Sequence, residues 1–125
     1  MHLKVFFSRI LSFSFITAVL LQSACASKTA IVYQAKGDKQ CEQGGLSLQQ
    51  SSRKLMDAGI SVTQSFCGKK TGFSVMTMCG GPTNNILLHL VADTDIEQAK
   101  AIGFQPIEKL ATGDSKGYET IPCHP

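Results

Sequence analysis

The sequence predicts an α+β fold, with two helices packed on one face of a mainly antiparallel sheet. A helix closed by a glycine and followed at once by an apolar strand occurs twice, at 54–60 and at 100–104. Between these units lies Ile86–Val91, a nearly continuous apolar run of the kind that central strands carry. Each helix has a single apolar stripe to bury, so both are expected on the same face.

The first half reads as strand, helix, strand. Residues 30–35 have the β-branched and aromatic content of a strand. Ser47 with Gln50 three residues later forms a capping box, which marks the start of a helix. Gly59 stands where a glycine commonly ends one. Residues 60–66 then alternate between apolar and polar, which is the period of a half-buried strand.

The second half adds a strand at 73–78, a turn at 80–85 and the apolar strand at 86–91. Thr94 and Glu97 form another capping box for a second helix, which Gly103 closes. Residues 104–110 are the last predicted strand, with Pro106 indicating an edge position. The resulting order, β-α-β-β-β-α-β, is that of a ferredoxin-like split β-α-β sandwich with one extra strand.

The first residues are typical of a secretory signal. Two cations are followed by the apolar run Ile10–Leu21 and then by small residues. This run is too short to cross a bilayer, which takes roughly 20 residues. We expect residues 1–26 to be removed by cleavage after Ala26. The alternative is a lipoprotein signal, 1–24, with Cys25 lipidated. Residues 27–110 would form one α+β domain, and 111–125 an irregular tail tied down by Cys123.

Either processing route leaves four cysteines, an even number, in an oxidising compartment, which predicts two disulfides. From the expected topology, Cys41 and Cys67 lie at one end of the sheet. We therefore predict the pairs Cys41–Cys67 and Cys79–Cys123. A zinc site is disfavoured because no two cysteines have the close spacing of zinc ligands, and a C-x-x-C redox motif is absent.

Composition argues against nucleic acid as a partner. The formal charge of +3 falls to +1 once Lys4 and Arg9 leave with the signal, and the chain has no Trp to stack on bases. We expect no cofactor and no metal. The spacing of a calcium loop is absent from the acidic residues Asp93, Asp95 and Glu97. The end of the chain at Cys123–His124 is interpreted as a tail held by one disulfide, not as a metal site.

The sequence offers a binding surface rather than a catalytic constellation. It is the turn cluster at 80–85 with two neighbouring lysines, or the sheet face that no helix covers. Lys36 and Lys39 should join the lysines in a basic rim able to meet an anion. The residues of the predicted surface are Lys69, Lys70, Gly80, Gly81, Pro82, Thr83, Asn84 and Asn85.

His89 interrupts the strongest strand and is interpreted as a hydrogen-bonded structural histidine, because no partner base or nucleophile is marked beside it. The predicted function is therefore a small exported, disulfide-bonded, non-enzymatic binding domain of the bacterial cell envelope. It would be periplasmic, or an outer-membrane lipoprotein tethered through Cys25. Its partner would be an envelope protein or a cell-wall component. The alternative is an envelope hydrolase or redox enzyme with a site around His89.

Overall fold

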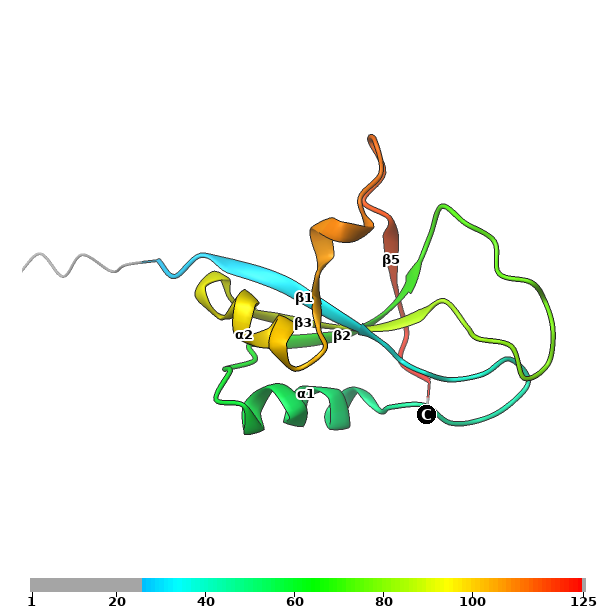
Figure 1. Cartoon of the computed structure of the whole chain (residues 1–125), viewed down its shortest axis with the longest axis horizontal. Helices are drawn as coiled ribbons and strands as arrows, with labels where there is room; N and C mark the ends of the chain where they lie inside the picture. The colour runs from blue at the N-terminus through cyan, green and yellow to red at the C-terminus, as the bar shows by residue number, and fades with distance from the viewer. Residues whose placement is uncertain (1–25, 125) are drawn as a thin grey trace, which may run out of the picture.

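A computed structural model describes residues 26–124, so the predictions for residues 1–25, including lipidation of Cys25, lie outside the described part. Figure 1 shows the chain with its elements labelled. The helices are α1 (Leu48–Asp57) and α2 (Ile96–Ala101), with single 3-10 turns η1 (Asp93–Asp95) and η2 (Ile107–Leu110). The strands are β1 (Thr29–Ala35), β2 (Gln64–Lys70), β3 (Asn85–Ala92), β4 (Gln105–Pro106) and β5 (Tyr118–Ile121).

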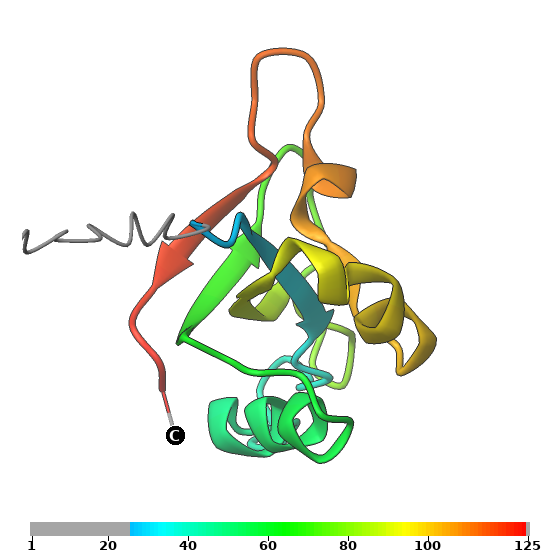
Figure 2. The ribbon, with the colours of Figure 1, turned by 90° about the vertical axis from the view of Figure 1, so that its left-hand side faces the viewer.

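The strands form one five-stranded sheet in the order β4-β1-β3-β2-β5, and every neighbouring pair is antiparallel. The α+β class and the antiparallel sheet are thus confirmed. Because β1 and β2 both run antiparallel to the β3 strand between them, they point the same way, as a connection through α1 requires. Figure 2 shows this sheet with β5 at one side and α2 toward the other.

Both helices cover the same face of the sheet, as predicted. Leu55 of α1 and Ala99 of α2 are fully buried in one cluster with Val32, Val91 and Phe104. Strand residues alternate between the two faces, so the neighbours of Val32 and Val91 point away from the helices. On that second face the buried residues Tyr33, Ile86 and Leu88 are packed by η2 and by half-buried side chains of β1, β2 and β5.

Helix α1 begins and ends as the local signals predict. The Ser47 hydroxyl accepts from the Gln50 amide at 3.1 Å, and the Gln50 side chain accepts from the Ser47 amide at 2.8 Å. Gly59 follows the helix with φ +82°, a conformation that glycine adopts without steric cost. The chain can therefore turn sharply and place Ile60, which is 1% exposed, beneath Leu55.

Three strand predictions are wrong in position. The strand expected at 60–66 is found at Gln64–Lys70, because Ile60 packs against Leu55 of α1 instead of pairing with a neighbouring strand. The strand expected at 104–110 pairs only at Gln105–Pro106, at the sheet edge, before η2 begins. Residues 73–78 form no strand. The fifth strand is β5, within the tail that we expected to be irregular.

The second capping box is also wrong. Residues 93–95 form the 3-10 turn η1, and α2 starts after Asp95 without any side-chain hydrogen bond at its N-cap. Glu97 bonds forward to Lys100 instead, with its carboxylate 2.9 Å from the ammonium. The α2 helix spans only six residues and is held by the burial of Ala99.

Two disulfides are present as predicted, but they join other partners, Cys41 with Cys79 and Cys67 with Cys123. The reason is the position of β5. Cys67 lies within β2 directly opposite Ile121, so the residues after β5 bring Cys123 to it. Cys79 instead lies beside the loop after β1, which contains Cys41. The two segments are also joined there by a hydrogen bond from the Gln40 amide to the Gly81 carbonyl at 2.9 Å. Either bridge adds stability of about 2–4 kcal/mol.

Candidate functional site

The turn at 80–85 does not stand free as a binding surface. Gly81 is buried, and Asn85 is already the first residue of β3. The Asp38 carboxylate accepts from the Thr83 hydroxyl at 2.5 Å and from the Asn85 side-chain amide at 2.6 Å. Pro82 is exposed, and its backbone forms an isolated antiparallel β-bridge with Lys39. The polar groups of the turn thus mainly hold two loops together.

Lys69 and Lys70 lie at the end of β2 next to this turn, and each already has a partner. The Lys69 ammonium is 3.7 Å from the Glu119 carboxylate, with both side chains about half exposed. The Lys70 ammonium lies 5.6 Å from the centre of the Tyr33 ring. An exposed ion pair of this kind contributes little and is easily exchanged for another ligand.

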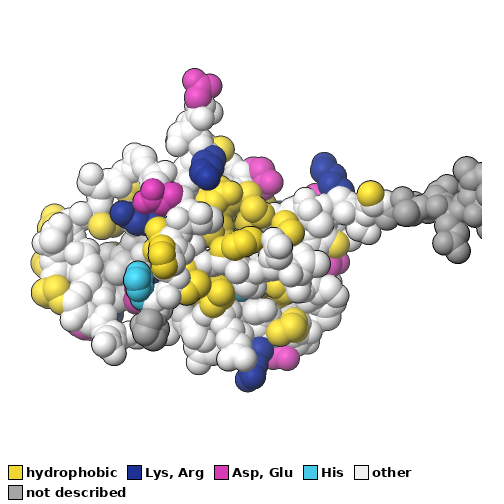
Figure 3. Space-filling view, turned by 180° about the vertical axis from the view of Figure 1, so that it is seen from behind, with side chains coloured by type: hydrophobic (Ala, Val, Ile, Leu, Met, Phe, Trp, Pro, Cys, Tyr) yellow, Lys and Arg dark blue, Asp and Glu magenta, His cyan; other side chains and the backbone are white. Residues whose placement is uncertain are grey.

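Among residues 26–124, the large apolar side chains with the highest exposure lie just before the turn. We call residues 71–79, between β2 and the turn, the apolar loop. Phe73 is 55% exposed, Met76 78% and Met78 57%, and the loop contains no charged residue. Figure 3 shows apolar side chains at the surface of this end of the molecule, at the left of the view. The sequence analysis assigned these residues to a strand, which would have buried alternate side chains.

The apolar loop is held at its base. The Cys41–Cys79 disulfide joins it to the loop after β1. The Gln40 side chain lies between the two segments, donating to the Met76 carbonyl at 2.8 Å and to the Pro82 carbonyl at 3.0 Å, and accepting from the Met78 amide at 3.1 Å. The Met78 carbonyl in turn accepts from the Gly81 amide. The polar groups therefore point inward while the apolar side chains point outward.

His89 lies at the centre of a closed polar network on the helix-covered face. Its Nε2 is 2.7 Å from the Ser51 hydroxyl of α1, and its Nδ1 is 2.7 Å from the Ser65 hydroxyl of β2. The Gln34 amide donates to the same Ser51 oxygen at 2.6 Å. Ser51 thus receives one hydrogen bond and has its own proton to donate to Nε2, which leaves Nδ1–H to donate to Ser65.

Burial dominates the electrostatics of this network. His89 and Ser51 are both 0% exposed. Desolvation lowers the pKa of His89 from 6.5 to about 4, so the imidazole is neutral at neutral pH. The Phe104 ring packs against it edge-on, with ring centres 5.8 Å apart. The interpretation of His89 as a hydrogen-bonded structural residue agrees with these contacts.

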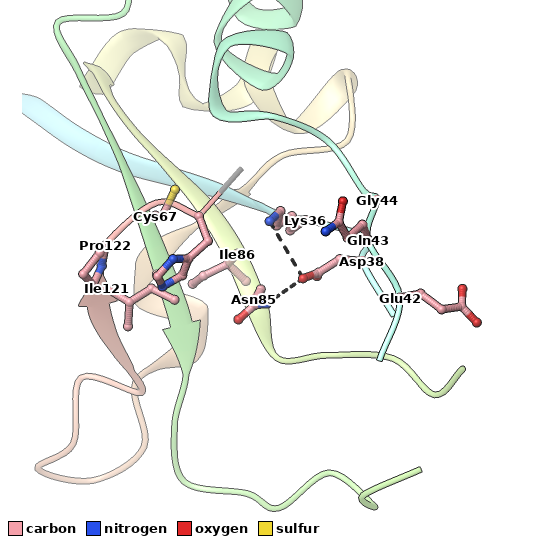
Figure 4. A pocket seen from close by; sticks show the side chains of 12 residues that line it. Lys36, Asp38, Glu42, Gln43, Gly44, Cys67, Asn85, Ile86, Ile121 and Pro122 are labelled. Atoms are coloured by element: carbon pink, nitrogen blue, oxygen red, sulfur yellow. Dashed lines mark hydrogen bonds and ion pairs between the residues drawn. The ribbon is translucent and has the colours of Figure 1, made fainter. Parts of the chain in front are cut away.

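A polar cavity opens between the loop after β1, β2 and the tail after β5 (Figure 4). Its volume is about 190 Å³. The Lys36 and Asp38 side chains are 17% and 12% exposed, and their charged atoms lie 3.9 Å apart. In Figure 4 dashed lines join Lys36 to Asp38 and Asp38 to Asn85, while Glu42 points away from them. Ile121 and Pro122 form the opposite wall.

This cavity offers polar contacts but no free cysteine thiol. Cys67, which lines it, is oxidised in the bridge to Cys123, and Asp38 is occupied by Thr83 and Asn85. His124 also lines it, as does the loop at Gln43. A second hollow of about 560 Å³ continues from it toward the start of α1. The expected basic rim is divided here, because Lys36 faces this cavity while Lys39 is exposed and Lys70 covers Tyr33.

No group of three or more His, Cys, Asp or Glu side chains within residues 26–124 is placed to hold a metal ion. The carboxylates of Asp93 and Asp95 lie in η1, and Glu97 pairs with Lys100. Across the same described range, no helix is long and apolar enough to span a membrane. Searches with known family models, curated proteins and solved structures find nothing that matches this chain.

Proposed function

We propose that this chain is a small exported, non-enzymatic binding domain of the bacterial cell envelope, and that it binds through the apolar loop. The observation that carries the proposal is the exposure of Phe73, Met76 and Met78 on a loop fixed by a disulfide and by Gln40. Exposed apolar side chains that gather on one loop commonly mark an interaction surface. Methionine adapts its shape to a partner, which suits such a surface.

The four paired cysteines support export, because disulfides persist in oxidising compartments. The signal at residues 1–26, with cleavage after Ala26, and its lipoprotein alternative at Cys25 remain predictions. Intact mass of the protein isolated from its host tests both. Cleavage after Ala26 gives an unmodified 99-residue chain with four oxidised cysteines, counted from 125 residues less 26. An excess mass of acyl chains on Cys25 would favour the tethered form instead.

The alternative, a hydrolase or redox enzyme around His89, has one favourable contact, the hydrogen bond between Ser51 and Nε2. A serine and a histidine at this distance are the usual parts of a nucleophile and its base. Both side chains are nevertheless 0% exposed, so a substrate would reach them only if α1 moved away. The oxidised cysteines offer no thiol to either chemistry. We therefore place the function at the surface.

We also propose that the core belongs to the ferredoxin-like split sandwich. The elements β1-α1-β2-β3-α2-β4 follow its order. β3 is inserted between β1 and β2, which are joined through α1, and β4 lies beside β1. β5 is then an addition at the outer edge of β2. A solved structure tests this arrangement through the β1–β4 pairing, which rests on Val32 and Tyr33.

The binding proposal is tested by fractionation of host cells that produce either the wild type or a variant with Phe73→Ser, Met76→Ser and Met78→Ser. We expect a larger share of the wild type to co-sediment with the envelope fraction. The matched control is Leu46→Ser with Met56→Ser, which removes exposed apolar side chains elsewhere, at 38% and 49% exposure. Equal co-sedimentation of the wild type and both variants would overturn the assignment of the loop.

A further inference from the structure

We propose that the ligand of the apolar loop is a lipid bilayer, into whose headgroup region the loop inserts Phe73, Met76 and Met78. This inference rests on the proposed function and names the class of its partner. A loop that enters an interface needs exposed apolar side chains, few charges and a backbone whose polar groups have partners.

The side chains meet the first two conditions. Phe73, Met76 and Met78 are all more than half exposed, and no Asp, Glu, Lys or Arg occurs in residues 71–79. Such side chains gain free energy when they leave water for acyl chains, in proportion to the apolar area that becomes buried. Insertion is therefore favourable without a shape-matched pocket.

The third condition, backbone polar groups with partners, is met at Met76 and Met78. Gln40 binds the Met76 carbonyl and the Met78 amide, and the Gly81 amide binds the Met78 carbonyl. These groups need no water, so they can approach acyl chains at low cost. The amides at 72–77 and at Cys79 donate to no other protein group within residues 26–124, so the loop belongs at the hydrated interface rather than in the hydrocarbon core.

Charged side chains surround the base of the loop. Lys39 is exposed, and Lys69 and Lys70 directly precede the loop. Asp38 pairs with Lys36. The remaining acidic neighbours are Glu42, which is exposed, and Glu119, which pairs weakly with Lys69. One net positive charge remains, three lysines against two glutamates, and long lysine side chains can reach headgroups while the loop lies deeper. Anionic headgroups are accordingly favoured by a few-fold over neutral ones.

A bilayer fits this loop better than a protein groove does. Peptide segments usually dock on proteins as an added strand, as one face of a helix or as a proline-rich helix. Residues 72–78 form neither helix nor strand and contain no proline, so they present none of these regular patterns. A fluid interface accepts an irregular set of side chains, and the apolar loop offers such a set.

The test uses a fluorophore in the loop itself. The chain contains no Trp, so Phe73→Trp introduces a single reporter of similar shape. The purified protein, in the N-terminal form that the host produces, is titrated with vesicles of phosphatidylcholine alone or mixed with phosphatidylglycerol. We expect a blue shift in emission, quenching by brominated acyl chains, and a few-fold tighter partition into the mixed vesicles.

Two further variants in the Phe73→Trp background complete the test. Met76→Ser with Met78→Ser should lower the partition constant by about tenfold or more, since two exposed apolar side chains are lost. Leu46→Ser with Met56→Ser should leave it unchanged. A common N-terminus cancels any contribution from a tether. No shift with either vesicle, or a shift that needs no lipid and follows protein concentration, would overturn the lipid proposal. Loop-dependent envelope association without vesicle binding would leave the proposed function standing and make the partner a protein.

Discussion

The helix-covered core and the apolar loop have opposite arrangements of polarity. In the core, Leu55, Val91 and Phe104 are fully buried. The buried polar side chain of His89 lies among them, and both of its ring nitrogens form hydrogen bonds with serine hydroxyls. At the loop end, the polar side chain of Gln40 lies between segments, while the side chains of Met76 and Met78 project outward. The two regions sit at different places along the molecule, with the loop farthest from the start of β1 (Figure 1).

This difference separates stability from recognition. The core gains free energy from apolar burial, which is the main driving force of folding. The loop end buries little apolar surface and is held by a disulfide and by hydrogen bonds, so its apolar side chains are available to a partner. Substitutions should therefore have large effects on the free energy of unfolding in one region and effects mainly on binding in the other.

The largest expected effect comes from Leu55→Ala. This side chain is 0% exposed between α1 and the sheet, and its removal leaves a cavity that costs about 2–5 kcal/mol. Met76→Ala, at 78% exposure, should change the free energy of unfolding by less than about 0.5 kcal/mol. Urea unfolding of the oxidised proteins measures both. Equal losses in the two variants would show that the loop is packed in solution.

The elements that the sequence predicted well are those specified by local chemistry. The helix α1 is marked by Ser47, Gln50 and Gly59, all of which act within a few residues of the chain. The central strand β3 is marked by its apolar composition, which needs burial on both faces. These signals do not depend on where other segments lie, so the sequence alone is sufficient.

The errors arise where several segments compete for one position. Residues 73–78 have the composition of a strand, but β1 and β2 already flank β3, and β5 occupies the outer edge of β2. Composition alone does not determine which segment pairs with the outer edge of β2. The disulfide error follows directly, because β5 is what brings Cys123 to Cys67.

The site was only partly predictable for the same reason. The structural role of His89 could be inferred from its place in an apolar strand, but its partners Ser51 and Ser65 lie 38 and 24 residues away. The predicted turn at 80–85 lies beside the apolar loop but uses its polar groups internally. Nothing in the sequence pattern marks Gln40 as the residue that fixes the loop, since no local signal points to it.

A smaller effect in the core is pH dependence. The pKa of His89 is about 4 in the folded chain and 6.5 when unfolded, so between these values the unfolded state binds more protons. The contribution of this residue to stability is fully present above pH 6.5 and is lost as the pH drops toward 4, a change of about 3 kcal/mol. His89→Gln should flatten this slope in urea unfolding at stepped pH. An unchanged slope would assign the acid sensitivity to other groups.

A smaller loss of stability than at Leu55 or His89 is expected at the loop end, from Gln40→Ala. The substitution removes three hydrogen bonds, but they lie near the surface, where water replaces them, so the net loss should be about 1–2 kcal/mol. The local effect should be larger. The Met78 amide loses its acceptor, and its hydrogen exchange should accelerate well beyond that of β3 amides, because the loop can then open without global unfolding. Gln49→Ala, an exposed position on α1, is the matched control and should change neither quantity. Equal exchange at Met78 in both variants would mean that the Cys41–Cys79 disulfide alone keeps the apolar side chains outward, and the contrast between the two regions would then rest on that one covalent bond.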